Sequence, residues 1–373
     1  MQDWQTAENI LCIRLDSIGD VVMTTPAIRA LKQALPGRRI TLMTSTAGSA
    51  IAPLISDLDA LIVYDAPWLK ATEQRQNPDR DRQMIAKLQQ ENFDAAVIFT
   101  VYSQNPLPTA LLCYWADIPL RLAHCHENPY QLLTDWIKDP EPEQFIRHEV
   151  QRQLDLVASV GCAIADPSLR LQVSPLTQNR VRQILIQNSV DLNRPWIVLH
   201  PGSTAPSRRY PAELYAIAAQ KLTQDYDVQI VLTGTPPEQS LIDLIQQEMA
   251  APSISLINQL NLPELAALLS LTPLLLSNNT GPVHIAAAFN TPIVDLYALT
   301  NPQHTPWNVP HRVLFHDVPC RYCYRSICPQ DHHHCLQLVP PETVVEAVVE
   351  LAGWKKLVAL GNGGWGVGSR EIL

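Results

Sequence analysis

The sequence predicts an α/β protein made of two parallel-sheet domains that face a cleft. Short apolar stretches of strand length alternate with helical stretches along most of the 373 residues. The alternation occurs in two consecutive runs of similar size, separated by helices and polar connectors. This length is comfortable for two domains of ordinary size, so we expect two Rossmann-like units.

The first run begins with an apolar strand over residues 10–15 and a polar loop over 16–20. Pro26 suits the first turn of a helix, and apolar residues recur after it at helical spacing, so we expect a helix over about residues 25–35. The run continues with predicted strands at 39–44, 60–65 and 95–100 and a helix at 81–90.

The middle of the chain predicts a helix near residues 148–160 and a strand with a linker over 166–178. The second run predicts strands at 196–200, 228–233, 254–257, 274–277 and 292–298, and helices at 211–224, from 238, at 263–270 and at 281–289. We therefore set the domains at residues 1–175 and 176–340. These domains are followed by a helix over 341–352 and a glycine-rich tail over 353–373. Packing of that helix back on the first domain is one option.

The composition excludes several classes of protein. The net charge of −9 argues against a nucleic-acid binder, which needs a basic surface. The polar N-terminus does not resemble a secretory signal, and no stretch approaches 18 uninterrupted apolar residues, so we expect a cytoplasmic protein without a membrane span. Its cysteines should then be reduced thiols or metal ligands, and the scattered ones buried: Cys12, Cys113, Cys125 and Cys162.

Polar loops follow three of the predicted strands. In the first, Gly19 allows a tight turn, and Asp20 would lie beside the free amides of a helix start. A simple helix cap is the alternative for Asp20. The segment is not a dinucleotide-binding fingerprint, because it has one glycine where that motif needs three.

The other two loops belong to the second run. Residues 200–211 offer hydroxyls, amides and guanidinium groups that suit a pyrophosphate, with a solvated turn as the alternative. Residues 277–284 lead into a helix whose start would hold an anion or sugar hydroxyls, with a capped helix and a buried histidine as the alternative. Parallel sheets bind ligands beyond the carboxyl ends of their strands, so these loops predict a site in the cleft.

Together these segments resemble glycosyltransferase family nine, the ADP-heptose:lipopolysaccharide heptosyltransferases. The resembling blocks are ILCIRLDSIGDVVMTTPAIRALKQALPGRRI, VLHPGSTAPSRRYP, VLTGTPPE and LLSNNTGPVHIAAAFNTPIVDLYALTNP. The resemblance implies a GT-B architecture, in which two Rossmann-like domains enclose the active site. It also implies an inverting transfer of a sugar, with heptose favoured, from a nucleotide diphosphate such as ADP-heptose. The implied acceptor is an anionic lipid-linked saccharide at the cytoplasmic face of the inner membrane, and catalysis needs no metal or other cofactor.

The resemblance also implies roles for single residues. Asp20 matches the aspartate that deprotonates the acceptor hydroxyl. Arg208 replaces the phosphate-binding lysine and keeps its charge. Asn279 stands where the family has an aspartate that contacts the donor sugar, which leaves the identity of that sugar open. Glu238 matches the acidic residue that holds the nucleotide ribose. The other matching donor residues are Ser203, Thr204, Thr280, Gly281 and His284.

Basic residues of the first run suggest the acceptor side. We place Gly19 and Arg14 there, and an anionic acceptor, or weak contact with the membrane surface, would suit a basic rim. An ordinary solvated helix face is the alternative. The basic residues concerned are Arg14, Arg29, Lys32, Arg38 and Arg39.

A cysteine cluster precedes the last helix. Cys320, Cys323, Cys328 and Cys335 lie within 16 residues, with His332, His333 and His334 among them. Four thiols at this spacing suit a structural zinc ion, while free or redox-labile thiols and, less readily, an iron–sulfur cluster are alternatives. For the whole chain, a nucleotide-sugar epimerase or hydrolase of the same fold and a non-catalytic binding protein remain rival functions.

Overall fold

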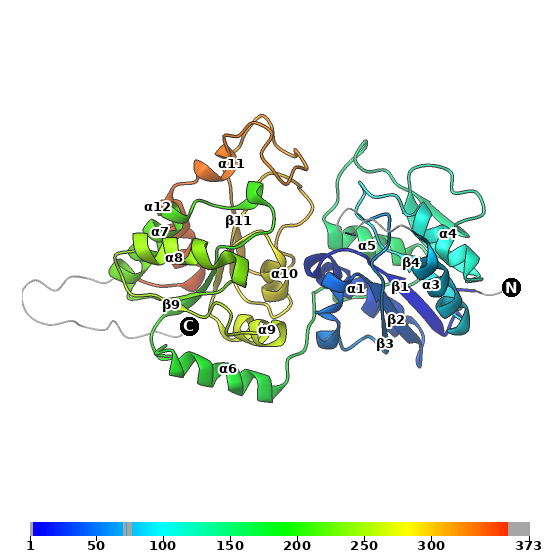
Figure 1. Ribbon diagram of the computed structural model, residues 1–373, viewed down its shortest axis with the longest axis horizontal. Helices are drawn as coiled ribbons and strands as arrows, with labels where there is room; N and C mark the ends of the chain where they lie inside the picture. The colour runs from blue at the N-terminus through cyan, green and yellow to red at the C-terminus, as the bar shows by residue number, and fades with distance from the viewer. Residues whose placement is uncertain (1–2, 70–71, 73–76, 357–373) are drawn as a thin grey trace, which may run out of the picture.

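The computed structural model describes residues 3–69, 72 and 77–356. They form two six-stranded sheets, each flanked by helices and lying at opposite ends of the long axis of the molecule (Figure 1). The paired strands in both sheets run parallel. The predicted α/β class is therefore confirmed.

The first sheet has the strand order β3-β2-β1-β4-β5-β6. Its strands are β1 (Asn9–Ile13), β2 (Arg39–Thr44), β3 (Ala60–Val63), β4 (Ala95–Ile98), β5 (Leu120–Cys125) and β6 (Asp135–Lys138). Its helices are α1 (Ile18–Ala34), α2 (Thr46–Ser49), α3 (Asp79–Gln90), α4 (Leu107–Trp115) and α5 (Glu149–Ala158), with a short 3-10 turn at Ala52–Leu54. The sequence did not predict α4, β5 and β6. Helix α4 is apolar except for Thr109 and so lacks helical periodicity, and β6 carries charges at the edge of the sheet.

The second sheet has the order β12-β11-β10-β7-β8-β9. Its strands are β7 (Trp196–His200), β8 (Gln229–Leu232), β9 (Ile254–Ser255), β10 (Leu275–Asn278), β11 (Ile293–Leu296) and β12 (His311–Leu314). Its helices are α6 (Pro175–Gln187), α7 (Ala212–Tyr226), α8 (Gln239–Glu248), α9 (Leu262–Leu271), α10 (Gly281–Ala287), α11 (His334–Gln337) and α12 (Pro341–Ala352), with 3-10 turns at Pro206–Arg208 and Pro236–Glu238.

Both sheets follow one topology. Numbered from the first strand of each run, each sheet reads 3-2-1-4-5-6, the order of dinucleotide-binding folds. The direction of winding therefore reverses between β1 and β4 in one sheet, and between β7 and β10 in the other. Ligands of such folds bind at these switch points. The loops after β1, β4, β7 and β10 are thus the places where a site is expected.

Helix α1 begins at Ile18, so the predicted start near residue 25 is wrong. Pro26 lies inside the helix and has no N–H for the carbonyl of Val22. The buried hydroxyl of Thr25 donates to that carbonyl at 2.7 Å instead. A neighbouring threonine thus compensates for the proline, and Asp20 becomes part of the first helical turn.

Two further expectations fail. No strand forms between residues 166 and 174, and α6 begins at Pro175 and packs on α9. Helix α12 packs on α7, with Val344 and Val348 in the core of the second sheet, so packing back on the first domain is wrong. The apolar face of a helix must be buried against another element. For α12 that element is the second sheet with its helix α7. The predicted tail lies outside the described residues from 357 onward.

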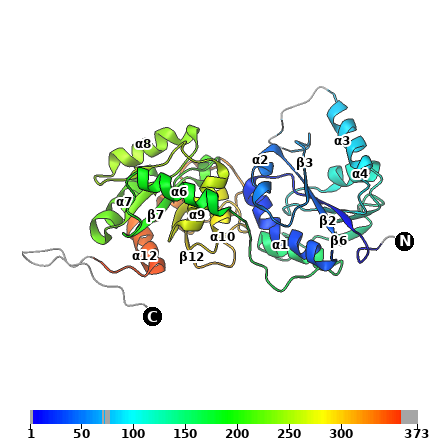
Figure 2. The same cartoon turned by 90° about the horizontal axis from the view of Figure 1, so that it is seen from below.

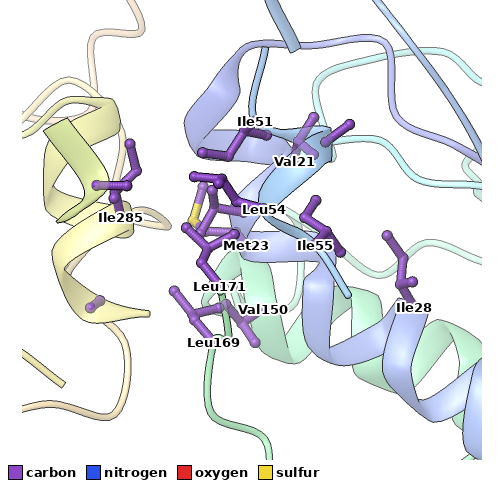
Figure 3. Close-up of a cluster of buried hydrophobic side chains, with 14 of the residues drawn as sticks. Val21, Met23, Ile28, Ile51, Leu54, Ile55, Val150, Leu169, Leu171 and Ile285 are labelled. Atoms are coloured by element: carbon purple, nitrogen blue, oxygen red, sulfur yellow. The ribbon is translucent and has the colours of Figure 1, made fainter. Parts of the chain in front are cut away.

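The two halves meet where α1 packs on α10, an arrangement visible in both views (Figure 2). Ile285 of α10 faces a cluster from the first half that includes Val21 and Met23, and all three are buried (Figure 3). Apolar burial of this kind stabilises the joint between the halves. Within the described ranges, no helix is long and apolar enough to cross a membrane.

Candidate active site

A buried arginine gathers three carboxylates at the carboxyl end of β1. The Arg14 side chain is fully buried and pairs with Asp16 at 2.8 Å and with Asp20 at 3.1 Å. It also pairs with Glu149, the first residue of α5, at 2.6 Å. Such partners offset the cost of burying the charge. Arg14, predicted for the acceptor side, therefore holds the carboxylates in place and has no surface to offer to an acceptor.

Asp20 caps the helix and stays partly accessible. Ser17 donates to it from its amide at 3.2 Å and from its hydroxyl at 2.7 Å, so the capping role that the sequence left open is present. Burial alone would raise the pKa of Asp20, but the charge of Arg14, helped by His304, outweighs burial and lowers the pKa to about 2. Asp20 is thus ionised at neutral pH and able to accept a proton.

Asp16 is the second partly accessible carboxylate of this cluster. Burial raises its pKa to about 6, against the opposing charge of Arg14. Gln104, in the loop after β4, donates to Asp16 at 2.6 Å across the switch point. Beside it, a cavity of about 140 Å³ is lined by residues 102–106 and 125–127. A cavity with polar lining residues therefore adjoins the carboxylates.

Gly19 lets the first half approach the second. A Cβ atom on Gly19 would lie 2.9 Å from Cδ2 of His284, so a larger residue would push the two helices apart. Burial lowers the pKa of His284 to about 3, and the neighbouring His304 adds to this effect. The two rings lie 6.4 Å apart between centroids, and the charge of Asp20 acts on both. Two histidines of the second half thus face the carboxylate of the first.

The loop after β7 carries three of the residues predicted to bind the donor. Ser203 is buried, and its carbonyl accepts from Nε of Arg209 at 2.8 Å, whereas Thr204 is exposed. Arg208 follows in the 3-10 turn, and its Nε is buried without a partner among the described residues. A buried guanidinium N–H without an acceptor suits an anionic ligand.

Glu238 lies directly against this loop. A Cβ atom on Gly202 would come within 1.8 Å of Oε1 of Glu238, so the glycine is needed for the close approach. The amide and hydroxyl of Thr235 donate to Oε2 of Glu238 at 2.7 and 2.8 Å. The structure therefore brings the acidic residue predicted for the ribose next to the residues predicted for the pyrophosphate.

The loop after β10 completes the second switch point. Asn279 is almost fully buried and donates through Nδ2 to Asp295 at 2.9 Å and to the carbonyl of His304 at 2.7 Å. Thr280 precedes α10, and its hydroxyl donates to the carbonyl of Asn278 at 3.3 Å. Helix α10, which starts at Gly281, has only seven residues, so its dipole gives little help in binding an anion.

Sequence reasoning missed Glu149, Asp295 and His304. A signal for Asp295 was present, because it is the single carboxylate in the apolar strand β11, and a buried carboxylate needs a hydrogen-bond partner. Glu149 carried no local signal because its partner Arg14 lies 135 residues away. His304 carried none because Asp20, whose charge acts on it, belongs to the other half.

Of the predicted basic rim, only Lys32 and Arg39 keep accessible side chains. Arg38 is buried and donates to three backbone carbonyls, of Trp4, Ala7 and Leu31. Arg29 is buried and donates to two carbonyls near residue 167. These arginines tie connecting segments to α1, because buried carbonyls outside regular structure need donors. The expectation of an anionic acceptor therefore loses most of the support that the basic residues gave it.

The four clustered cysteines line one small cavity of about 20 Å³ together with His332. The sulfur of Cys320 lies 3.8 Å from Nε2 of His332. In the described part of the chain, no group of three or more metal-binding side chains is arranged around a common point. The scattered cysteines are buried, as predicted: Cys12, Cys113, Cys125 and Cys162.

Known proteins share this fold and these sequence features. The family model for glycosyltransferase family 9 (heptosyltransferase) matches residues 82–334. Lipopolysaccharide heptosyltransferase 2 of Escherichia coli is 27% identical over 310 residues, which is 80% of this chain and 84% of that protein.

Two solved structures extend the comparison. The family 9 glycosyl transferase from Veillonella parvula has a TM-score of 0.76 at 20% identity, covering 94% of this chain and 98% of that one. The ADP-heptose lps heptosyltransferase II of E. coli has a TM-score of 0.69 at 23% identity, covering 92% and 98%. The expected GT-B architecture is thereby confirmed, and the match over more than half of its length shows that the chain belongs to glycosyltransferase family 9.

Proposed function

We propose that this glycosyltransferase moves heptose from ADP-heptose to a saccharide acceptor of the lipopolysaccharide type, with inversion at the anomeric carbon. The observation that carries the proposal is the position of Asp20. An ionised carboxylate of the first half faces His284 and His304 of the second half, where the two switch points meet. The heptosyltransferases of similar sequence and fold support the choice of sugar and acceptor.

The proposed reaction is a single displacement. Asp20 takes the proton of the acceptor hydroxyl, whose oxygen forms a bond to the anomeric carbon as the bond to the ADP oxygen breaks. Arg208 and the hydroxyls of Ser203 and Thr204 stabilise the charge that develops on the diphosphate, a task that requires no metal in this scheme. Glu238 binds the ribose.

The acceptor is assigned to the cavity after β4 and β5. Its polar groups include the side chains of Gln104, Asn105 and Glu127, which suit sugar hydroxyls. Because Gln104 contacts Asp16, a sugar bound there would lie next to the carboxylate cluster. We place the reaction at the cytoplasmic face of the inner membrane, where a nucleotide sugar would meet a lipid-linked saccharide.

The decisive test is Asp20→Asn. We expect kcat for transfer to fall by roughly 10²- to 10⁴-fold, because the amide cannot accept the proton, while the Kd for ADP-heptose stays within about twofold. Asp227→Asn is a matched control: Asp227 is half-exposed at the end of α7 with a φ of 58°, a conformation that asparagine tolerates. Transfer by Asp20→Asn at the control's rate would refute the assignment of the base.

Nucleotide binding separates the rival functions. ADP at about 100 times its Kd should add about 2.7 kcal/mol to the free energy of unfolding, whereas UDP, GDP and NAD should add far less. Release of ADP from ADP-heptose without an acceptor would favour a hydrolase. Binding without turnover on any acceptor would favour the non-catalytic homologue.

We also propose that the cysteine cluster binds a structural zinc ion. The four thiols and His332 share one cavity, which supports this site. The cysteine segment also joins both halves, since Tyr324 hydrogen-bonds to Tyr102 and the hydroxyl of Ser207 donates to the carbonyl of Arg325 at 2.7 Å. Metal analysis should find one zinc per chain, lost in Cys328→Ser and kept in Cys113→Ser. Metal-free wild-type protein would refute the site.

A further inference from the structure

The amide of Asn279 is held in one orientation. Its Nδ2 atom lies 2.9 Å from Oδ2 of Asp295 and 2.7 Å from the backbone carbonyl of His304. A carbonyl oxygen can only accept a hydrogen bond, so the atom facing it must be the NH₂ group. Both N–H bonds are used in this way. The amide oxygen therefore points away from Asp295, and no described residue donates to it.

Asp295 has no other evident task in the described structure. It is fully buried on β11, one strand away from the loop that carries Asn279, and its Oδ1 atom has no described partner. A buried carboxyl group is costly, so its retention in an apolar strand calls for a role. Its one side-chain hydrogen bond is to Asn279.

We propose that Asp295 is a positioning residue for donor-sugar recognition: it fixes Asn279 so that only the amide oxygen is offered to the sugar hydroxyls. This inference rests on the proposed function. In the family, a carboxylate at this position accepts hydrogen bonds from the sugar. Here, the amide of Asn279 offers only its oxygen to the sugar, because the buried Asp295 holds its NH₂ group.

The arrangement also links the sugar site to the base. The carbonyl of His304 fixes Asn279, while its imidazole ring lies in the field of Asp20. His304 thus hydrogen-bonds to the residue proposed to bind the sugar and interacts electrostatically with the proposed base. A sugar that fits Asn279 is thereby placed near the carboxylate that activates the acceptor.

The test compares binding of ADP with binding of ADP-heptose by calorimetry. The quantity of interest is the ratio of the two Kd values, which isolates the sugar. In wild-type protein we expect ADP-heptose to bind more tightly. Asp295→Leu removes the acceptor for the amide while keeping a side chain branched at Cγ, and should reduce this preference by about tenfold, leaving the Kd for ADP within about twofold. Asn279→Ala should have the same effect.

Two further variants distinguish positioning from packing. Asp295→Asn still offers an oxygen to Asn279 and should keep the preference. Asn279→Asp combined with Asp295→Leu restores an accepting carboxylate at the sugar and should recover it. If wild-type protein binds ADP-heptose no more tightly than ADP, the proposed donor and this inference are both overturned. Two outcomes would overturn only the inference. In one, Asn279→Ala keeps the wild-type preference for ADP-heptose; in the other, Asp295→Asn loses that preference as fully as Asp295→Leu does.

Discussion

At the residue scale, the site depends on how single charges are buried. Arg14 contacts both Asp16 and Asp20, yet their pKa values move in opposite directions. Burial dominates for Asp16, whereas Arg14, His304 and Ser17 together dominate for Asp20. The carboxylate with the low pKa is the one that faces the second half. Asp20 is thus ionised at neutral pH, while burial raises the pKa of Asp16 to about 6 against the charge of the same arginine.

Arg208 is expected to contribute most of the diphosphate affinity. Arg208→Ala should raise the Kd for ADP roughly 10- to 100-fold, because a hydrogen bond to a charged group contributes about 1.5–3 kcal/mol. Arg208→Lys keeps the charge but loses the planar fork, so an intermediate Kd is expected. Titration calorimetry measures both. Equal affinity of wild type and the alanine variant would place the diphosphate elsewhere.

The buried Asp295 makes stability depend on pH. Burial raises its pKa to about 8, above the usual value of 3.8. A group with a raised folded-state pKa stabilises the fold below its unfolded pKa, and that stabilisation is lost as the pH rises through the folded pKa. We therefore expect Asp295→Asn to gain stability relative to wild type between pH 4 and 8, by at most about 1.4 kcal/mol per pH unit. Urea unfolding at several pH values measures the difference, and a difference that does not vary with pH would contradict the assigned shift.

At the element scale, α1 carries both the proposed base and an internal proline. Asp20 lies in its first turn and Pro26 in its interior, so the helix must stay regular past a missing hydrogen bond to keep the carboxylate in place. The Thr25 hydroxyl provides that continuity. The sequence alone suggested a helix start at Pro26 because first-turn prolines are common, whereas the compensating side chain becomes visible only in the fold.

A double-mutant cycle tests this compensation. Thr25→Val leaves the buried carbonyl of Val22 without a donor and should cost about 1–3 kcal/mol in the free energy of unfolding. In a Pro26→Ala background, the restored amide N–H replaces the hydroxyl, so the same change should cost much less. Equal costs in both backgrounds, measured by chemical unfolding, would show that the hydroxyl does not compensate for the proline.

At the scale of the whole molecule, the sequence predicted the site residues that follow strands, but it did not predict the contacts between segments that are far apart in the chain. The residues around Asp20, Arg208 and Asn279 were predictable, because strand-to-helix junctions and glycines are local signals. The contact of Glu149 with Arg14 was not, because a partner 135 residues away leaves no trace in a local pattern. The same limit explains why three arginines expected on a basic rim are buried, since burial of an arginine depends on tertiary packing.

The joint between the halves yields the last prediction. Trp307 donates to the carbonyl of Pro167 at 2.9 Å, and its ring lies 4.5 Å from that of His148, beside the start of α5. Trp307→Ala should loosen this contact and change the distance between Asp20 and the bound donor. A misplacement of about 1 Å between reacting groups can lower the rate by up to roughly 100-fold. We expect kcat to fall at least tenfold while the Kd for ADP is kept. Trp115→Ala, at an exposed site on α4, is the matched control and should keep full turnover. Unchanged kcat in Trp307→Ala would mean that the joint does not align the two sites.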